Sequence, residues 1–340
     1  AIINNMDSFI NVDNLTVINA ELSNYCNAAC PMCPRFDFDL NLVKGSTNNS
    51  HTTLDVVKNN IGPRVLSQIE KFYSCGVLGD GSMNPECLQI YEYIKQCGDA
   101  HLALNTNGGA RSPDFWQELG KLKVRVIFSI DGLEDTNHLY RRNVKWERLM
   151  ENVNAFIQAG GVADWDFLAF KHNQHQLEQA EELSKKMGFE TFKRKWTTRW
   201  DDFDSDGNWR QRESIQVDDY KLEKVKTQSN TQRLAATQKE KIIKDTFRTR
   251  KITCNSFNDW NREIYLAANG EVSPCCWLGD LKMHEAKNII KDYEKININH
   301  TNLKEILEGD FFKELANGIK GIEGAYRLQT CYHTCGVVNA

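Results

Sequence analysis

The chain has 340 residues and a net charge of −4, with 41% hydrophobic and 26% charged residues. This balance predicts a globular protein of two domains, or of one large barrel with an appendage, and excludes collagen-like, membrane-spanning and mainly disordered chains. No apolar run approaches the roughly 18 residues that cross a bilayer, and the first residues lack the basic and apolar pattern of a signal peptide. We therefore expect a cytoplasmic protein with no membrane or nucleic acid partner.

Apolar strands and amphipathic helices alternate between residues 15 and 200, after an N-terminal extension at 1–14. Strands are predicted at 15–22, 72–78, 101–105, 124–130, 165–170 and 189–196, and helices at 52–69 (with a break at Gly62-Pro63), 86–97, 113–122, 146–159 and 174–187. Thr52 is predicted to cap the first helix, with Asp55 reaching back to it. Such βα repeats predict a parallel sheet covered by helices, either a barrel or a doubly wound sheet, and both bind ligands at the carboxyl ends of their strands.

The rest of the chain has a different character. Residues 201–253 are charged and rich in turn residues, and we interpret them as a linker or insertion that is helical in part from Asp218 onward. Residues 254–340 form a shorter unit that bears cysteines. Within it, residues 264–274 predict a β-hairpin around the turn Asn269-Gly270.

Eleven cysteines are distributed unevenly. Three lie within eight residues near the N-terminus and five lie after residue 250, whereas Cys75, Cys87 and Cys97 are scattered and are assigned to packing. An odd number without an export signal argues against a disulfide framework. The two clusters therefore indicate metal or iron–sulfur ligands.

The first cluster spells C-x3-C-x2-C with Cys26, Cys30 and Cys33, directly after the first predicted strand. Three thiolates on one tight loop can hold three irons of a [4Fe–4S] cluster and leave the fourth iron open to another ligand. A structural zinc site is the alternative, but it would need a fourth protein ligand.

This motif resembles that of the radical S-adenosylmethionine (SAM) superfamily over roughly residues 15–200. The resemblance implies that the open iron binds the amino and carboxylate groups of SAM. It further implies that an electron from the cluster cleaves SAM to a 5′-deoxyadenosyl radical, which abstracts a hydrogen atom from a substrate. We accordingly expect an α/β fold with a partial (β/α)6 TIM-like barrel.

Three further segments resemble motifs of the superfamily, each after a predicted strand. Residues 79–85 resemble G-E-P-x-x-N-P with Asp80 in place of Glu and Gly81 in place of Pro, residues 105–108 resemble the T-N-G turn, and residues 129–132 match S-x-D-G. The resemblance implies that Asp80 helps to hold the SAM ammonium and that Arg141 or Arg142 pairs with the SAM carboxylate or with Asp131. The SAM-binding residues implied are Gly79, Asp80, Gly81, Asn107, Ser129, Asp131, Arg141 and Arg142.

The second cluster combines Cys254 and Cys275, in a C-x15-G-x4-C pattern, with Cys331 and Cys335. The predicted hairpin would bring the first two together, and four cysteines complete a [4Fe–4S] set. The pattern resembles the SPASM/twitch extension of radical SAM enzymes, in its short twitch form with one auxiliary cluster in a small α+β domain. A zinc ribbon is the alternative. Cys276 is left over, and it is a buried thiol, an alternative ligand or a hydrogen-atom donor.

Three functions remain open at this point. We favour a radical SAM enzyme with two [4Fe–4S] clusters that modifies a peptide or protein, with flavodoxin or ferredoxin as electron donor. The alternatives are a radical SAM dehydrogenase or epimerase for an amino sugar or nucleotide derivative, and an iron–sulfur or zinc protein without SAM chemistry. Residues 197–202 and 209–212, rich in Arg and Trp, either line the substrate pocket or form a solvated loop.

Overall fold

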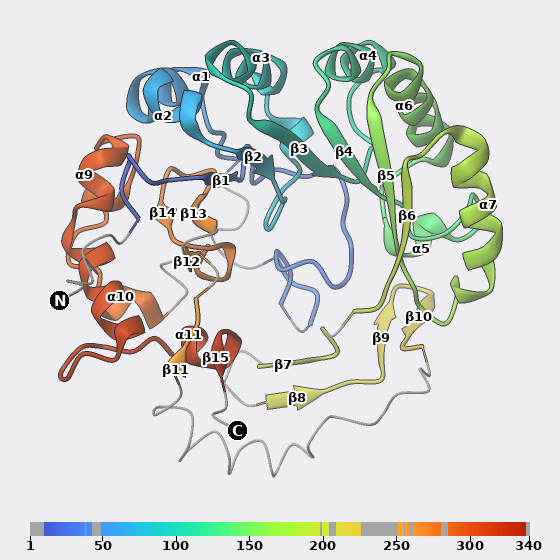
Figure 1. Ribbon diagram of the computed structural model, residues 1–340. Helices are drawn as coiled ribbons and strands as arrows, with labels where there is room; N and C mark the ends of the chain where they lie inside the picture. Colours follow the sequence, from blue (N-terminus) through green and yellow to red (C-terminus); the bar gives the residue numbers. More distant parts are fainter. Residues whose placement is uncertain are drawn as a thin grey trace.

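The structure is a computed structural model that describes residues 10–37, 39–42, 49–197, 199–203, 209–225, 251–254, 256–258, 261–279 and 285–337. Its centre is a sheet in which β12 (Phe257–Asn258) and β13 (Asn261–Leu266) are followed by β1-β2-β3-β4-β5-β6 (Figure 1). The strands from β1 to β6 are parallel and follow chain order. These strands are β1 (Val17–Ala20), β2 (Lys71–Ser74), β3 (His101–Thr106), β4 (Arg125–Ser129), β5 (Val162–Leu168) and β6 (Thr191–Lys195). The prediction of a partial barrel is confirmed.

Helices cover one face of this sheet, as the βα alternation predicts. They are α1 (Leu54–Val56), α2 (Pro63–Gln68), α3 (Cys87–Cys97), α4 (Pro113–Lys121), α6 (Trp146–Gln158) and α7 (Leu177–Met187). The short α5 (Asn137–Tyr140) lies instead in the connection between β4 and α6, near the carboxyl ends of the strands. Between α4, β4 and α6, the fully buried rings of Trp116, Phe128 and Phe156 contact one another with centroids 5.4–6.4 Å apart. Such aromatic packing fixes the helices against the strands and so places the loops between them.

The first helix differs from its prediction at the N-terminus. Thr53, not Thr52, is the cap: its extended backbone lets its side chain accept a hydrogen bond from Val56 N. The Thr52 hydroxyl instead donates to the carbonyl of Glu21 at 3.4 Å, because Thr52 sits beside the chain that leaves β1. The predicted break is present, with Gly62 at φ +84° and Pro63 as the first residue of α2.

The segment after β6 forms two short hairpins where the structure describes it. β7 (Asp201–Phe203) pairs with β8 (Trp209–Gln211), and β9 (Ser214–Val217) pairs with β10 (Tyr220–Glu223). The expected helix from Asp218 is therefore wrong for 220–223, where the alternation of Ile215, Val217 and Leu222 buries one face of a hairpin. The remainder of that prediction, at 226–250, lies outside the described residues.

The C-terminal segment joins the main sheet. β13 (Asn261–Leu266) runs parallel to β1, with Val17 opposite Glu263 and Ala20 opposite Leu266. The predicted hairpin is confirmed, since β13 pairs with β14 (Val272–Ser273) and Gly270 at the turn has φ +91°. The other elements are β11 (Lys251–Ile252), β12 (Phe257–Asn258), α9 (Leu303–Leu307), α10 (Asp310–Lys320), α11 (Gln329–Thr334) and β15 (Gly336–Val337).

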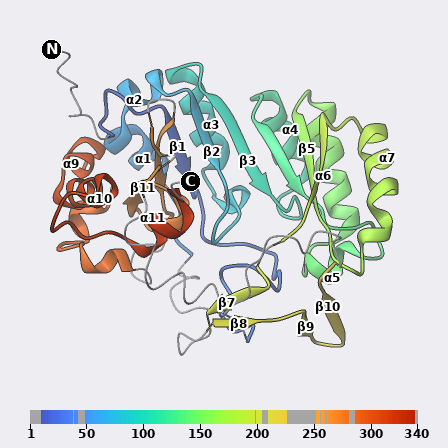
Figure 2. The same ribbon diagram turned by 60° about the horizontal axis from the view of Figure 1, so that its bottom comes forward.

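Figures 1 and 2 show α9 and α10 at the β1 side of the sheet, whereas α7 lies at the β6 side. Among the helices described, none has the length and apolar character needed to cross a membrane.

Candidate functional site

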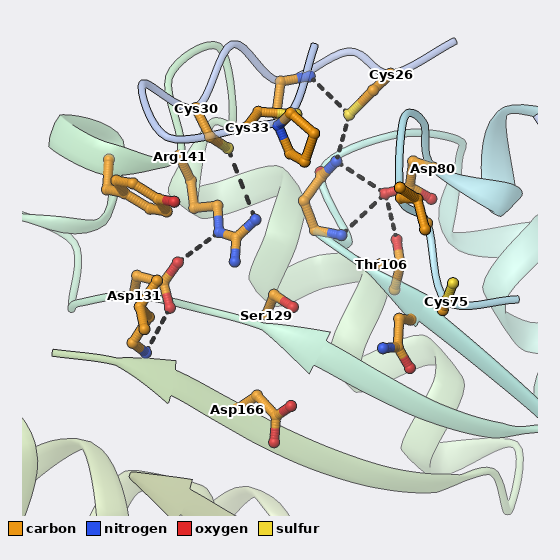
Figure 3. Close-up of a pocket in the computed structure, with 18 of the residues that line it drawn as sticks. Cys26, Cys30, Cys33, Cys75, Asp80, Thr106, Ser129, Asp131, Arg141 and Asp166 are labelled. Carbon is orange, nitrogen blue, oxygen red and sulfur yellow. Dashed lines mark hydrogen bonds and ion pairs between the residues drawn. The ribbon is translucent and has the colours of Figure 1, made fainter. Parts of the chain in front are cut away.

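The carboxyl ends of the parallel strands open onto a cavity of about 730 Å³. Its wall combines the loop after β1, the loops after β2 to β5, and the segment that follows β6 (Figure 3). The polar and sulfur-bearing side chains on this wall include Cys26, Cys30, Cys33, Cys75, Asp80, Thr106, Asn107, Ser129, Asp131, Arg141 and Asp166. Four motifs that lie apart in the sequence therefore meet at one end of the sheet.

The cysteine loop after β1 presents all three predicted thiols to this cavity. The sulfur of Cys26 accepts hydrogen bonds from Ala28 N at 3.4 Å and from the Asn107 amide at 3.5 Å. The sulfur of Cys30 accepts one from the Arg141 guanidinium at 3.6 Å (Figure 3). Donors aimed at sulfur stabilise negative charge there.

Burial acts against thiolates in this loop. It raises the pKa of Cys26 to about 12 and that of Cys30 to about 11, while the positive charges of Arg35 and Arg141 respectively oppose the shifts. Arg35 is buried, donates to the carbonyls of Cys26 and Ala28, and hydrogen-bonds Cys33. The loop thus offers three free thiols as iron ligands. Two guanidinium groups and two further N–H groups surround them, and such positive and hydrogen-bonding groups fit an anionic [4Fe–4S] cluster. Sequence reasoning missed Arg35, although it lies two residues after the last cysteine.

Asp80 is buried, and both oxygens of its carboxylate accept hydrogen bonds from the protein. One carboxylate oxygen accepts from Ser82 N at 3.0 Å and Ser82 Oγ at 2.7 Å. The other accepts from Thr106 Oγ1 at 2.9 Å, and from Asn107 N and Nδ2 at 2.9 and 2.8 Å. Asp80 thereby joins the loop after β2 to the turn after β3, and it orients Asn107 toward Cys26 (Figure 3).

The two glycines beside Asp80 have different positions. Gly79 lines the cavity, and a Cβ there would lie 2.0 Å from the carbonyl oxygen of Ser23, so only glycine lets the two loops approach. Gly81 faces away from the cavity wall into the core, where a Cβ would lie 2.7 Å from Ser74 Oγ.

Glu21 holds the Gly79 loop through hydrogen bonds to its backbone. The sequence analysis did not identify this residue. One of its carboxylate oxygens accepts from the backbone N–H groups of Leu78 and Gly79, the latter at 2.9 Å. The other accepts from the hydroxyl of Tyr265 on β13 at 2.7 Å. Burial raises the pKa of Glu21, and these hydrogen bonds oppose the shift. Glu21 thus links the predicted SAM loop to the C-terminal hairpin.

The structure separates the two adjacent arginines. Arg141 is half-buried, lines the cavity, and pairs through Nε with the fully buried Asp131 at 2.6 Å. The same carboxylate accepts from Leu168 N at 2.7 Å, and Ser129 lies on the wall nearby. Arg142 points elsewhere and pairs with the exposed Asp218 on the turn between β9 and β10. Of the two candidates, Arg141 is the one at the site.

The four C-terminal cysteines come from three segments that the fold brings together. β11 pairs with β15, and Thr253 N donates to the carbonyl of Cys335 at 2.9 Å, while Cys331 lies in α11. Burial raises the pKa of Cys275, and the charges of Cys254 and Cys331 raise it further. Burial and the charge of Cys335 raise the pKa of Cys254 to about 11. Each of the four thiols therefore affects the pKa of at least one other, or has its own pKa changed by one. Within the described part of the chain, no three His, Cys, Asp or Glu side chains are placed to hold a single metal ion.

Family models match both parts of the chain. The model of the radical SAM superfamily matches residues 20–183, and the SPASM model, an iron–sulfur cluster-binding domain, matches residues 254–336. The chain carries a radical SAM domain and a SPASM domain. No curated protein sequence matches it.

Solved structures are similar in fold to most of the chain. SuiB from Streptococcus suis has a TM-score of 0.57 at 14% identity, over 91% of this chain and 68% of SuiB. SuiB bound to its precursor peptide SuiA has a TM-score of 0.53 at 13% identity, over 94% of this chain and 76% of that one. The protein anSMEcpe, with bound AdoMet and the Cp18Cys peptide, has a TM-score of 0.51 at 14% identity, over 94% and 88%.

The rim of the radical SAM cavity carries cationic and aromatic side chains from the end of β6, from the segment after it and from the Cys276–Leu278 helix. Lys195 pairs with Asp166, and Arg199 donates to the carbonyl of Met32 at 3.2 Å. The indoles of Trp196 and Trp277 are 52% and 66% exposed, and both lie at the cavity. Of the 197–202 loop, for which a pocket wall and a solvated loop were both open, Thr197 and Arg199 line the cavity. Residues 198 and 204–208 lie outside the described structure.

Cys276 has a partner that the sequence analysis did not foresee. It begins the short 3-10 helix Cys276–Leu278 of the SPASM domain, and interaction with it, together with burial, raises the pKa of Cys75, the residue directly after β2. Cys75 lines the cavity, so its assignment to packing is wrong, whereas Cys87 is fully buried in α3. The position of Cys75 at the carboxyl end of a predicted strand could have indicated that it lies at the site.

Proposed function

We propose that this chain is a radical SAM enzyme that cleaves SAM reductively and abstracts a hydrogen atom from a peptide or protein substrate. Cys26, Cys30 and Cys33 hold a [4Fe–4S] cluster, and SAM lies in the cavity beside it. The observation that carries the proposal is that the three thiols share one cavity with the carboxyl ends of β2 to β5. When bound, the cluster and SAM supply an electron and a primary carbon radical.

The protein side chains position SAM in this proposal. Arg141, held by Asp131, presents its remaining N–H groups to the SAM carboxylate. The tight loop at Gly79 lets the backbone approach the methionine part, and Ser129 faces the ribose or carboxylate. Asp80 acts through Asn107 and Thr106 rather than by touching the ammonium, because both of its oxygens are already occupied.

The SPASM domain holds a second [4Fe–4S] cluster on Cys254, Cys275, Cys331 and Cys335. The four thiols match the four ligands that such a cluster needs, and their mutual electrostatic effects support one shared site. A soluble one-electron donor such as flavodoxin or ferredoxin reduces the enzyme.

The rim favours a peptide or protein over a small molecule. A cavity of 730 Å³ lies within the range of about 300–1,000 Å³ that small ligands occupy, so volume alone admits both. The exposed Trp196 and Trp277, however, give the open side of the cavity a broad apolar surface that suits a peptide. SuiB and anSMEcpe, which share the fold, are described with bound peptides.

Metal content and product formation test this function together. Anaerobically reconstituted protein should contain about eight irons and eight sulfides per chain, and a C26A/C30A/C33A variant about four. With SAM and dithionite, the wild-type protein should form 5′-deoxyadenosine and the triple variant none. About four irons in both proteins, or no 5′-deoxyadenosine from the wild type, would contradict the proposal.

The substrate class needs its own experiment. A short peptide encoded beside this gene should raise the rate of 5′-deoxyadenosine formation and lose hydrogen from one residue. The W196A/W277A variant should raise KM for that peptide while SAM cleavage without peptide continues. Stimulation by an amino sugar or nucleotide derivative, with none by the peptide, would favour the small-molecule alternative.

A further inference from the structure

The loop after β2 is held in place by the chain that follows β1. Three consecutive backbone N–H groups of the loop donate to that chain. Those of Leu78 and Gly79 share one carboxylate oxygen of Glu21, the latter at 2.9 Å. The next one, of Asp80, donates to the carbonyl of Tyr25 at 2.9 Å. Glu21 is 1% exposed, so water cannot replace its hydrogen bonds, and its carboxylate fixes the orientation of the peptide groups that it holds.

The orientation of these peptide groups decides what they offer to the cavity. A trans peptide group points its N–H and its C=O in opposite directions. Because the N–H groups of Leu78 and Gly79 face Glu21, the carbonyls of Val77 and Leu78 face away from it. Val77, Leu78 and Gly79 line the cavity, and Glu21 lies behind them. The two carbonyl oxygens are thus directed toward the cavity, where they can accept from a cationic group such as an ammonium.

The second carboxylate oxygen of Glu21 takes part in a contact between the two domains. It accepts from the hydroxyl of Tyr265 at 2.7 Å, and the Tyr265 side chain is fully buried. Tyr265 lies on β13, which pairs with β1 on the side away from β2 (Figure 1). The backbone N–H of Glu21 also donates to the carbonyl of Leu266 on β13 at 2.7 Å. One residue therefore connects the SPASM strand with the loop at the cavity.

We propose that Glu21 is a positioning residue for SAM and that Tyr265 makes the affinity for SAM depend on the SPASM domain. This inference rests on the proposed radical SAM function. With the Tyr265 hydroxyl in place, both carboxylate oxygens are hydrogen-bonded and the side chain keeps one orientation. Without it, one buried oxygen loses its donor, and the carboxylate turns from the loop toward other donors. The loop must then be ordered when SAM binds, which lowers the affinity.

The test measures SAM binding to the reconstituted full-length enzyme, without substrate or reductant. Equilibrium dialysis with radiolabelled SAM gives the dissociation constant, and iron analysis checks that each variant carries its clusters. Y265F should raise the dissociation constant on the order of tenfold, within the range of about 5- to 150-fold that is typical of coupling between two sites. With dithionite and saturating SAM, 5′-deoxyadenosine should form at the wild-type rate, because only the affinity for SAM is changed.

Tyr73 offers a matched control. Its hydroxyl donates to Glu263 at 2.7 Å, so it also joins the radical SAM domain to β13 by a hydrogen bond from a tyrosine to a carboxylate. The acceptor is Glu263 rather than Glu21, and Y73F should therefore leave the dissociation constant of SAM unchanged. An equal rise in Y73F and Y265F would mean that any loosening between the domains weakens SAM binding, which overturns the assignment to Glu21.

Substitutions of Glu21 separate its hydrogen bonds from its charge. In E21Q the amide oxygen still accepts from the loop and the amide nitrogen can donate to Tyr265, so SAM affinity should stay close to that of the wild type. E21M keeps the length of the side chain without an acceptor and should weaken SAM binding more than Y265F does. Adding Y265F to E21M should have no further effect, because Tyr265 acts through the carboxylate. If E21M does not retain its clusters, E21Q and the comparison of Y265F with Y73F decide.

Each other outcome contradicts a stated part of the proposal. An unchanged affinity in Y265F overturns the dependence on the SPASM domain, and an unchanged affinity in E21M overturns the role of Glu21. A loss in E21Q as large as that in E21M, or a full further loss when Y265F is added to E21M, overturns positioning through these hydrogen bonds. A slower reaction of Y265F at saturating SAM with unaltered affinity does so as well. A wild-type enzyme that binds no SAM overturns the proposed function instead.

Discussion

The two cysteine sets reach their places in different ways. Cys26, Cys30 and Cys33 occupy one loop after β1, so the chain brings them together within eight residues. Cys254, Cys275, Cys331 and Cys335 depend on the β13–β14 hairpin, the β11–β15 pair and α11. A site built within one loop needs little beyond local turns, whereas an assembled site needs the long-range fold. The comparison teaches that the second set should be the more sensitive to changes away from its ligands.

The largest effects should come from removing one ligand of each set. C30A should lose the first cluster and all formation of 5′-deoxyadenosine, because that site also binds SAM. C275A should lose the second cluster and keep SAM cleavage. Iron analysis and 5′-deoxyadenosine assays of both variants check this, with about four irons expected in each. Loss of SAM cleavage in C275A at unchanged first-cluster content would show that the two sites are not separable in this way.

The site formed by the cysteine loop after β1 could be predicted from the sequence for a physical reason. Spacing within a loop carries over directly into space, so Cys26, Cys30 and Cys33 could be placed together, as could the strands whose ends carry Asp80 and Asn107. The six parallel strands were also predicted to within a few residues, because apolar alternation is a local pattern.

The features that were missed depend on contacts between distant segments. Cys75 looked like a packing cysteine because the cavity that it lines is built from loops far apart in the sequence. Glu21 was hidden in an alternating strand, and its function shows only through Gly79 and Tyr265. Strand pairing of β13 with β1 likewise leaves no local signal. The choice between Arg141 and Arg142 depends on the direction in which each side chain points, and the spacing of residues in the sequence does not determine that direction.

The two arginines give the next largest contrast within the radical SAM domain. R141A leaves Asp131 as a buried carboxylate without its ion-pair partner, which typically costs about 3–5 kcal/mol, and should also weaken SAM binding. R142A removes a solvent-exposed pair with Asp218 and should cost at most about 1 kcal/mol. Urea unfolding and SAM titration of both variants measure the difference. Equal losses in the two variants would contradict the placement of Arg141 at the site.

A change at the hairpin turn tests whether the second set depends on the long-range fold. In G270A the new Cβ would lie 2.2 Å from the Asn299 amide nitrogen, at a φ of +91°. The left-handed backbone costs about 1–2 kcal/mol by itself, and the clash adds to it. The second cluster should be lost or bound weakly while the first cluster is retained.

The matched control for G270A is G321A. Gly321 also has a positive φ, +72°, but a Cβ there meets nothing within 4 Å. It should show the backbone cost without loss of iron. If G270A and G321A retain the same iron, the hairpin turn is not what positions Cys275.

An effect smaller than those of R141A and G270A should come from the Tyr265 hydroxyl, which joins the two domains. Y265F removes the hydrogen bond to Glu21 and should cost about 1–2 kcal/mol at neutral pH. Burial raises the pKa of Glu21 above its usual 4.5, so the native state binds a proton more tightly than the unfolded chain. The contribution of Glu21 to stability therefore falls as pH rises through its native pKa. Tyr265 opposes this fall, because its O–H donates to the ionised carboxylate.

The cost of Y265F should consequently grow as pH rises from 4.5 toward neutrality, and should shrink as Glu21 becomes protonated. Urea unfolding at several pH values in that window measures it. Y326F is the control, since Tyr326 is 39% exposed and lies outside the Glu21 network. A cost of Y265F that does not change with pH would mean that Glu21 keeps one protonation state throughout. The link between the SAM loop and the SPASM hairpin would then be a neutral hydrogen bond, and it would couple the two domains without responding to pH.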